Sequence, residues 1–204
     1  CIRTSVVTAT MTAIRTGAPQ LISVMPQDVI DEIGISVGDE YEGKKVSKNG
    51  CPSEGTVDIF IEPHTPPPHL VIYGKAPVAE ALKKLAPQFG WAVKVAKEDV
   101  ELSISSKLVV IVVATQGIND LKSLSAAIKL KPTFVSFVGS KRKFTSLKAK
   151  LANSGFAETD IEKVKAPAGL DIGAVTPEEI SLSILAELLQ VRKNYRNGAC
   201  DECN

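Results

Sequence analysis

The chain has 204 residues, of which 44% are hydrophobic and 23% are charged, and its formal net charge is +1. This length and balance suit a globular protein with one medium domain and a smaller one. Nucleic-acid binding is disfavoured, because Lys+Arg nearly equals Asp+Glu and only 5% of the residues are aromatic. No apolar stretch approaches a membrane span and no secretory leader is recognisable, so we expect a cytoplasmic protein without membrane contact.

The first 63 residues are expected to form a smaller α+β domain. Their patterns predict a helix over 5–16, strands over 21–24 and 56–61, and a loop or short strands over 25–48. Three consecutive prolines within residues 64–69 then favour a stiff, extended linker between two domains.

Residues 70–197 read as a second, larger domain in which strands alternate with helices. The expected strands are 70–73, 91–96, 108–113 and 133–138, and the expected helices are 77–89, 119–129, 141–154 and a final helix after 176. Such alternation predicts a Rossmann-like, doubly wound parallel sheet, and the continuous apolar run Val109–Val113 suits a strand covered on both faces. Phe89 and Trp91 are expected to be core aromatics between the first helix and the second strand of this domain. Residues 198–204 form a cysteine-containing tail.

The final helix has a strongly specified start. The Thr176 hydroxyl can cap the first turn, Pro177 suits the first helical position, and Glu179 can complete a capping box. Ahead of it, Gly169 and Gly173 bracket Asp171, so this loop can bring a carboxylate and backbone amides toward a ligand. The alternative is a tight loop-to-helix junction without a ligand.

Two further loops are candidates for binding an anion, because each follows a predicted strand and opens a helix. After residues 70–73 the chain has Gly74, Lys75 and Ala76, and after 133–138 it has Gly139, Ser140 and Lys141. Carboxyl ends of parallel strands share one sheet edge, where ligands of such folds gather, so these loops are expected to line one cleft. For both loops the alternative is an ordinary strand-to-helix turn exposed to solvent.

Several segments resemble the xanthine dehydrogenase accessory factor family, XdhC/CoxI. The run 166–189, APAGLDIGAVTPEEISLSILAELL, is similar to the family's GLDIGA-x-TPEEIALSILAE. FVGSKRK at 137–143 resembles GLLGSRRK, residues 50–63 resemble the end of the family's N-terminal domain, and residues 69–81 resemble the opening of its Rossmann-like domain.

The resemblance also covers the first residue. Members usually carry an upstream stretch ending in SGGC, and Cys1 stands at the position of that cysteine, so we expect Cys1 to begin a processed or partial chain. In the family this cysteine is implicated in handling molybdenum cofactor, and a thiolate near a helix start suits ligation or sulfur transfer. Cys51 lies two residues from the family's second cysteine position and could substitute for it, or it could be a small buried residue.

The chain departs from the family pattern at two loops. Ala76 and Pro77 replace the Gly-His of the family's GAGHVA, and Gln116-Gly117 replaces the His-Asp that usually follows Thr115. Lys97 stands where a dinucleotide-binding fold usually has the acid that holds the ribose hydroxyls. Ordinary NAD binding is therefore weakened, and Lys75 and Lys97 favour additional phosphate over a free ribose.

A third group of candidate ligands is the Cys-x-x-Cys pair near the end of the chain. Cys200 and Cys203 have the spacing of half a zinc or iron–sulfur site, and the alternative is a reduced tail pair. Further ligands would have to come from a second subunit or from this chain's other cysteines and histidines, which are Cys1, Cys51, His64 and His69.

The resemblance implies an accessory protein that binds molybdenum cofactor and assists its delivery to a molybdenum hydroxylase, with a sulfurtransferase as a second partner. No residue is expected to be catalytic. An exposed sheet edge in the N-terminal domain could be covered in a homodimer. Two other functions stay open, namely an NAD(P)-dependent oxidoreductase or redox sensor, and a scaffold subunit that has kept the fold and lost the ligand.

Overall fold

The computed structural model describes residues 3–50, 55–64, 66–98 and 106–198. By its internal contacts the chain divides into two units, Cys1–Thr65 with Arg196–Asn204, and Pro66–Tyr195. Each unit has its own sheet and its own apolar core.

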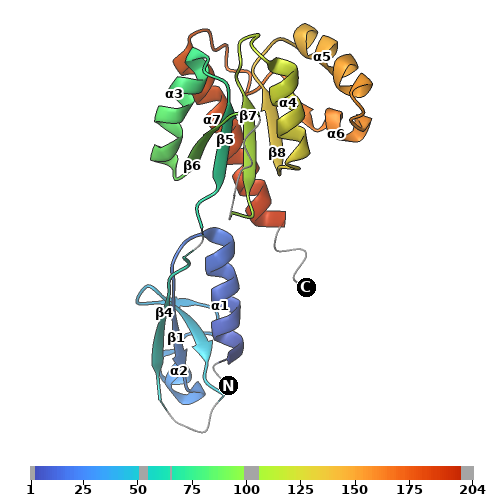
Figure 1. Ribbon diagram of the computed structural model, residues 1–204. Helices are drawn as coiled ribbons and strands as arrows, with labels where there is room; N and C mark the ends of the chain where they lie inside the picture. The colour runs from blue at the N-terminus through green and yellow to red at the C-terminus, as the bar shows by residue number, and fades with distance from the viewer. Residues whose placement is uncertain (1–2, 51–54, 65, 99–105, 199–204) are drawn as a thin grey trace. The chain divides into compact units, whose positions relative to one another are not determined.

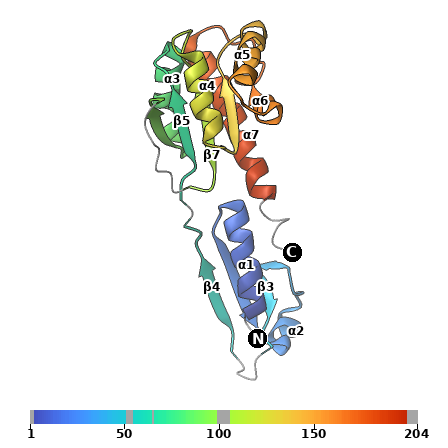
Figure 2. The same cartoon turned by 45° about the vertical axis from the view of Figure 1, so that its right-hand side comes forward.

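The N-terminal unit is built on a small mixed sheet with the strand order β2-β3-β1-β4. β1 (Gln20–Met25) pairs in parallel with β3 (Lys44–Lys48) and antiparallel with β4 (Val57–Ile61), and β2 (Glu40–Tyr41) is the other edge. Helix α1 (Arg3–Thr16) runs along this sheet (Figure 2) and packs Ala9 against Ile22 and Val24.

The segment 25–48 contains a helix that the sequence patterns do not predict. Helix α2 (Gln27–Ile33) covers Met25 and Val46 through the buried side chain of Ile30, and Gly34 ends it with φ +75°. Seven residues complete only about two turns, too few for a clear helical period of apolar residues.

The C-terminal unit contains a five-stranded, entirely parallel sheet with the order β6-β5-β7-β8-β9, most of which can be followed from left to right in Figure 1. The strands are β5 (His69–Tyr73), β6 (Ala92–Ala96), β7 (Val109–Val113), β8 (Phe134–Phe137) and β9 (Val164–Lys165). The helices are α3 (Pro77–Leu85), the 3₁₀ turn η1 (Ala86–Phe89), α4 (Asp120–Lys129), α5 (Lys141–Asn153), α6 (Glu158–Glu162) and α7 (Pro177–Gly198).

Alternate strand residues enter two separate cores on the two faces of this sheet. Leu70 and Ile72 pack with α3 and α7, whereas Val71 and Tyr73 pack with α4 and α5. Figures 1 and 2 show α4 and α7 on opposite sides of the strands. The doubly wound Rossmann-like fold predicted from the sequence is confirmed, and the run Val110–Val113 has no exposed surface, as a strand covered on both faces requires.

Three local features of this unit differ from the predictions. The helix expected over 77–89 ends at Leu85 and continues as the 3₁₀ turn, because Pro87 cannot donate to an α-helical hydrogen bond. Phe89, expected in the core, is 40% exposed, while Trp91 is buried. The short elements α6 and β9 were not expected, since a strand of two residues is defined by its neighbour β8 rather than by its own pattern.

Candidate functional site

The strand order fixes where a ligand site is expected in the C-terminal unit. From β5 the chain crosses to β6 through α3 on one face, and from β7 it crosses to β8 through α4 on the other face. The carboxyl ends of β5 and β7 therefore flank the switch point of the sheet, which is the place where doubly wound folds bind their ligands.

The loops at this edge carry the residues that the sequence nominates in the C-terminal unit. Ala168, in the loop after β9, donates its amide hydrogen to the carbonyl of Phe137 at the end of β8 (2.9 Å), so this loop joins the edge as well. The nominated residues at or next to the carboxyl ends of the strands are Gly74, Lys75, Lys97, Gly139, Ser140 and Lys141, and those in the loop after β9 are Asp171 and Gly173.

Gly74 makes the first turn possible. Its φ is +107°, and a Cβ atom on it would lie 2.1 Å from the carbonyl oxygen of Ala114. Ala76 donates its amide hydrogen to the same carbonyl at 3.3 Å and is itself only 9% exposed within the apolar cluster beneath α3. The turn thus rests directly on the end of β7, a close approach that only glycine allows.

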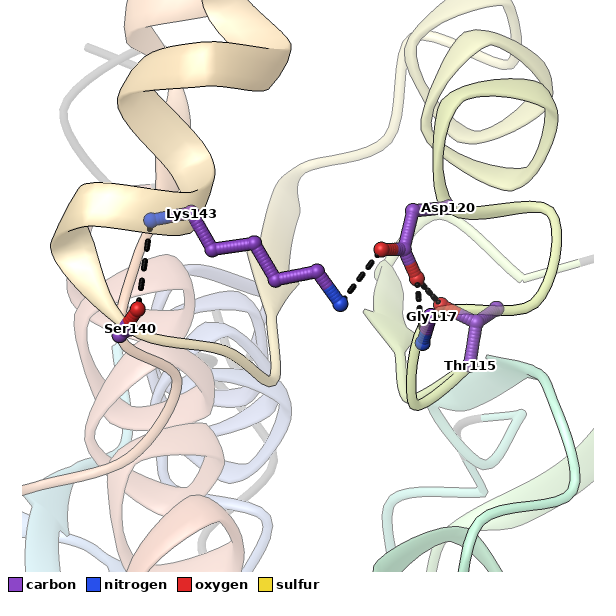
Figure 3. A network of polar contacts seen from close by, with 5 residues as sticks. All are labelled: Thr115, Gly117, Asp120, Ser140 and Lys143. Atoms are coloured by element: carbon purple, nitrogen blue, oxygen red, sulfur yellow. Dashed lines mark hydrogen bonds and ion pairs between the residues drawn. The ribbon is translucent and has the colours of Figure 1, made fainter.

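A buried carboxylate organises the loop after β7 (Figure 3). Asp120, at the start of α4, is 7% exposed and accepts hydrogen bonds from the Thr115 hydroxyl and from the Gly117 amide (3.1 Å). Its other oxygen lies 2.6 Å from Nζ of Lys143 on α5. One carboxylate therefore links the loop after β7 to the helix that follows β8.

The environment of Asp120 favours its ionised form. Burial acts to raise the pKa of this carboxyl, but hydrogen bonds from Lys143, Thr115 and Gly117 outweigh the burial and hold the pKa below its usual value. The position at the N-terminus of α4 favours a negative charge further. Lys143 is in turn steadied by the ring of Phe137, whose centroid lies 5.5 Å from Nζ.

The loop after β8 places two exposed cations beside this network. Gly139 lies so close to the Phe137 ring that a Cβ would come within 2.4 Å of it, and the Ser140 hydroxyl accepts the Lys143 amide hydrogen (3.2 Å) to cap α5. The next residues, Lys141 and Arg142, are exposed in the first turn of that helix. Cationic side chains and helix amides together are well suited to a phosphate group.

The acid that follows β6 does not face a ligand as in a dinucleotide-binding fold. Glu98 accepts a hydrogen bond from Ser123 on α4 (2.6 Å), and this bond lowers the pKa of its carboxyl. The exposed residue at the end of β6 is Lys97. This part of the edge therefore presents a cation where a free ribose would need a carboxylate.

The loop 166–176, hereafter the Asp171 loop, is anchored to α7. The predicted capping box is confirmed: Glu179 donates its amide hydrogen to the Thr176 hydroxyl (3.2 Å), and its carboxylate accepts from the amides of Thr176 (2.9 Å) and Val175 (2.8 Å). These bonds lower the pKa of the Glu179 carboxyl. Asp171 and Gly173 are exposed between the two ends of the loop.

The match with known proteins decides the family. Residues 70–188, more than half of the chain, match the family model described as the XdhC Rossmann domain. The chain belongs to the XdhC family. The resemblance read from the sequence motifs is thereby confirmed.

Two curated relatives come from Escherichia coli K12. This XdhC chain is 28% identical over 183 residues to the uncharacterized protein YqeB, covering 76% of the chain and 34% of YqeB. It is 28% identical over 134 residues to the molybdenum cofactor insertion chaperone PaoD, covering 64% of the chain and 42% of PaoD. The chain thus spans between a third and a half of the length of these relatives.

One solved structure supports the fold. A crystal structure of a xanthine dehydrogenase from Bacillus halodurans aligns with a TM-score of 0.53 and 20% identity, over 71% of this chain and 49% of that one. At this level of identity the alignment shows that the two chains share a fold.

The sulfur ligands that the motifs nominate are not part of the described structure. Cys1, Cys51, Cys200 and Cys203 all lie outside the described residues. Within the described part of this XdhC chain, no three His, Cys, Asp or Glu side chains gather in a way that could hold a metal ion. None of the helices described is long and apolar enough to cross a membrane.

Three buried or half-buried carboxylates bind groups near the carboxyl edge of this XdhC domain and were not predicted from the sequence. Asp120, Glu98 and Glu187 each bind a partner that is 18 or more residues away along the chain. The one local signal was the acid three residues after Gly117, at the second position of the helix expected over 119–129. The carboxylate of this acid, Asp120, faces back into the loop and accepts the Gly117 amide hydrogen.

Proposed function

We propose that this chain binds molybdenum cofactor and assists its delivery to a molybdenum hydroxylase of the xanthine, aldehyde or carbon monoxide dehydrogenase type. Membership of the XdhC family and the similarity to a relative named as a molybdenum cofactor insertion chaperone support this role. The cofactor is cargo here, and the protein holds it without chemical turnover.

The observation that carries the proposal is the charge pattern at the carboxyl edge of the parallel sheet. Lys75, Lys97 and Lys141 follow three different strands of one sheet, and each is exposed, whereas Asp120 and Glu98 already have hydrogen-bond partners. Molybdenum cofactor carries a pterin and a phosphate, and its dinucleotide form carries a diphosphate. Ammonium groups and helix N-terminal amides suit such groups.

Different segments of the chain would bind different parts of the cofactor. The Gly74 turn and the Gly139–Ser140 segment would bring backbone amides to the phosphate, and the Asp171 loop, with Gly173, would contact the pterin. Cys1 and Cys51 would ligate molybdenum or its terminal sulfur, because thiolates are soft ligands. A sulfurtransferase would be the partner that supplies sulfur, and Cys200 with Cys203 would supply two of the ligands of a metal site.

The experiment is a binding measurement with isolated molybdenum cofactor, supported by pterin content. The triple variant Lys75→Ala/Lys97→Ala/Lys141→Ala removes the three cations at the carboxyl edge. Its matched control is Lys83→Ala/Lys84→Ala/Lys129→Ala, which removes the same charge from the last turns of α3 and α4, at the other ends of these helices.

We expect the edge variant to lose at least tenfold in affinity and the control to bind like the unmodified protein. Equal binding by both variants would refute the assignment of the site. Parallel titrations with NADH and NADPH test the alternative of an NAD(P) protein, since saturable binding of either without binding of the pterin would favour that function. A protein that binds none of the three would be a scaffold subunit.

A further inference from the structure

We infer that Glu187 on α7 is the positioning residue of the candidate cofactor site, holding the Asp171 loop in its ligand-ready arrangement together with Lys165. The inference rests on the proposed function, because the loop is argued to contact the cargo. Glu187 does not itself reach the exposed edge, since only 4% of its surface is accessible.

Both carboxylate oxygens of Glu187 bind groups at the base of the loop. One accepts the amide hydrogen of Gly169 at 2.8 Å, and the other forms an ion pair with the ammonium of Lys165 on β9. Lys165 also donates to the carbonyl of Gly169 at 3.2 Å. Both backbone polar groups of Gly169 are therefore fixed by one pair of charges, the buried carboxylate of Glu187 and the half-exposed ammonium of Lys165.

The backbone at Gly169 lies directly against α7. Its φ is +91°, and a Cβ atom there would lie 2.3 Å from the Ser183 hydroxyl oxygen and 3.1 Å from the backbone nitrogen of Ile184. The next residue, Leu170, donates its amide hydrogen to the carbonyl of Ser183 at 3.2 Å. The loop leaves the helix surface only after this point.

The far end of the loop is anchored on the same helix. Glu179 accepts the amide hydrogens of Val175 and Thr176, and Glu187 follows it eight residues later, about 12 Å along the helix axis. The exposed residues 171–173 are thus held between two glutamates of α7. The stretch GLDIGA at 169–174 is therefore fixed to α7 at both of its ends.

An ion pair whose lysine side chain is 41% exposed adds little net stability by itself. Glu187 and Lys165 do something that apolar residues could not, because an apolar side chain cannot accept the Gly169 amide hydrogen. The loop is ordered before ligand binding, so binding does not include the entropy cost of ordering it. Losing this order should weaken cofactor affinity about tenfold, which corresponds to about 1.4 kcal/mol.

The experiment compares Glu187→Gln, Glu187→Ala and Lys165→Met with the unmodified protein in two measurements. The first is amide hydrogen exchange of residues 168–175, with the amide proton chemical shift of Gly169 as the spectroscopic signature of its carboxylate partner. The second is equilibrium binding of isolated molybdenum cofactor. Glu178→Gln, an exposed glutamate of the same helix, is the matched control.

We expect Glu187→Ala to speed exchange throughout the loop and to weaken cofactor binding about tenfold. Glu187→Gln should lie between the alanine variant and the unmodified protein, since its amide oxygen still accepts from Gly169, and Glu178→Gln should change neither readout. Should Glu187→Ala fail to fold, Glu187→Gln and Lys165→Met carry the test, with faster exchange and weaker binding still expected.

Unchanged affinity in variants whose loop exchanges faster would overturn the inference while leaving the proposed function intact. Unchanged exchange in the alanine variant would overturn it equally. If the unmodified protein binds no cofactor, the proposed function fails and the inference fails with it, and this outcome is read from the unmodified protein alone.

Discussion

Gly74→Ala should be one of the most damaging single substitutions in the C-terminal unit. The added methyl group would lie 2.1 Å from the carbonyl oxygen of Ala114, 2.5 Å from its carbonyl carbon and 2.8 Å from Cα of Thr115. All three atoms belong to the backbone, so no side-chain rotation relieves the clash. Reaching ordinary contact at 3.4 Å requires a shift of at least 1.3 Å, the difference between 3.4 and 2.1 Å.

The expected cost has two parts. A left-handed φ costs a residue other than glycine roughly 1–2 kcal/mol. Displacing the end of β7 breaks close packing at the centre of the sheet and adds at least about 2 kcal/mol, in the range of disruptive core changes. The total of at least about 3–4 kcal/mol is a large part of the 5–15 kcal/mol that stabilises a typical domain.

Gly173→Ala is the matched control, because Gly173 also has a positive φ, +72°, but a Cβ there would meet nothing within 4 Å. Urea unfolding followed by Trp91 fluorescence measures both variants, since Trp91 is the single tryptophan of the chain and is buried in the C-terminal unit. A free energy of unfolding for Gly74→Ala within about 0.5 kcal/mol of the control would refute the argument.

Three further substitutions test other contacts of the same unit. Because the pKa of Asp120 is held below its usual value, its charge stabilises the fold at pH values above the ordinary Asp pKa of about 3.9. This contribution is lost as the pH falls through the lowered pKa. Asp120→Asn should therefore lose less stability on acidification than the unmodified protein, as measured by urea titrations at several pH values. Thr176→Ala should cost about 1 kcal/mol at the start of α7, measured by thermal unfolding, with the loss absent if the cap were unimportant. Leu188→Ala, at a fully buried position, should cost about 2–5 kcal/mol by urea unfolding, whereas Leu182→Ala, at a position 49% exposed, should stay within about 0.5 kcal/mol.

The sequence predicted those features whose causes are local. The capping box joins residues three apart, and the parallel sheet follows from the alternation of apolar strands with helices, so both could be predicted without a structure. The short strand β9 could not, because two residues carry no period and become a strand only by pairing with β8.

The candidate site was predicted in outline for the same reason. Strand ends and glycine turns are visible along the chain, so the loops at the carboxyl edge could be named in advance. The carboxylates that arrange these loops bind distant partners: Asp120 meets Lys143 on another helix, and Glu187 meets Gly169 across the loop. Only the fold brings such pairs together, so spacing along the sequence did not reveal them.

Lys141 and Lys143 lie two residues apart in the same helix turn, yet the structure gives them different surroundings. Lys143 is ion-paired with the buried Asp120 and lies over the Phe137 ring, whereas Lys141 is exposed at the edge. Lys143→Met should therefore lower the free energy of unfolding by about 1–3 kcal/mol, since it leaves a buried carboxylate without its cation while the partly exposed lysine limits the loss.

Lys141→Met should leave the free energy of unfolding unchanged and weaken binding of an anionic ligand, because an exposed ammonium contributes little to folding but attracts a phosphate directly. Urea unfolding and titration with isolated molybdenum cofactor separate the two effects in the same pair of variants. If Lys141→Met lost stability and Lys143→Met lost only binding, the ion pair with Asp120 would belong to the ligand site and the cation at the edge to the fold. This outcome would contradict the assignment of Lys143 to the fold and of Lys141 to the ligand site.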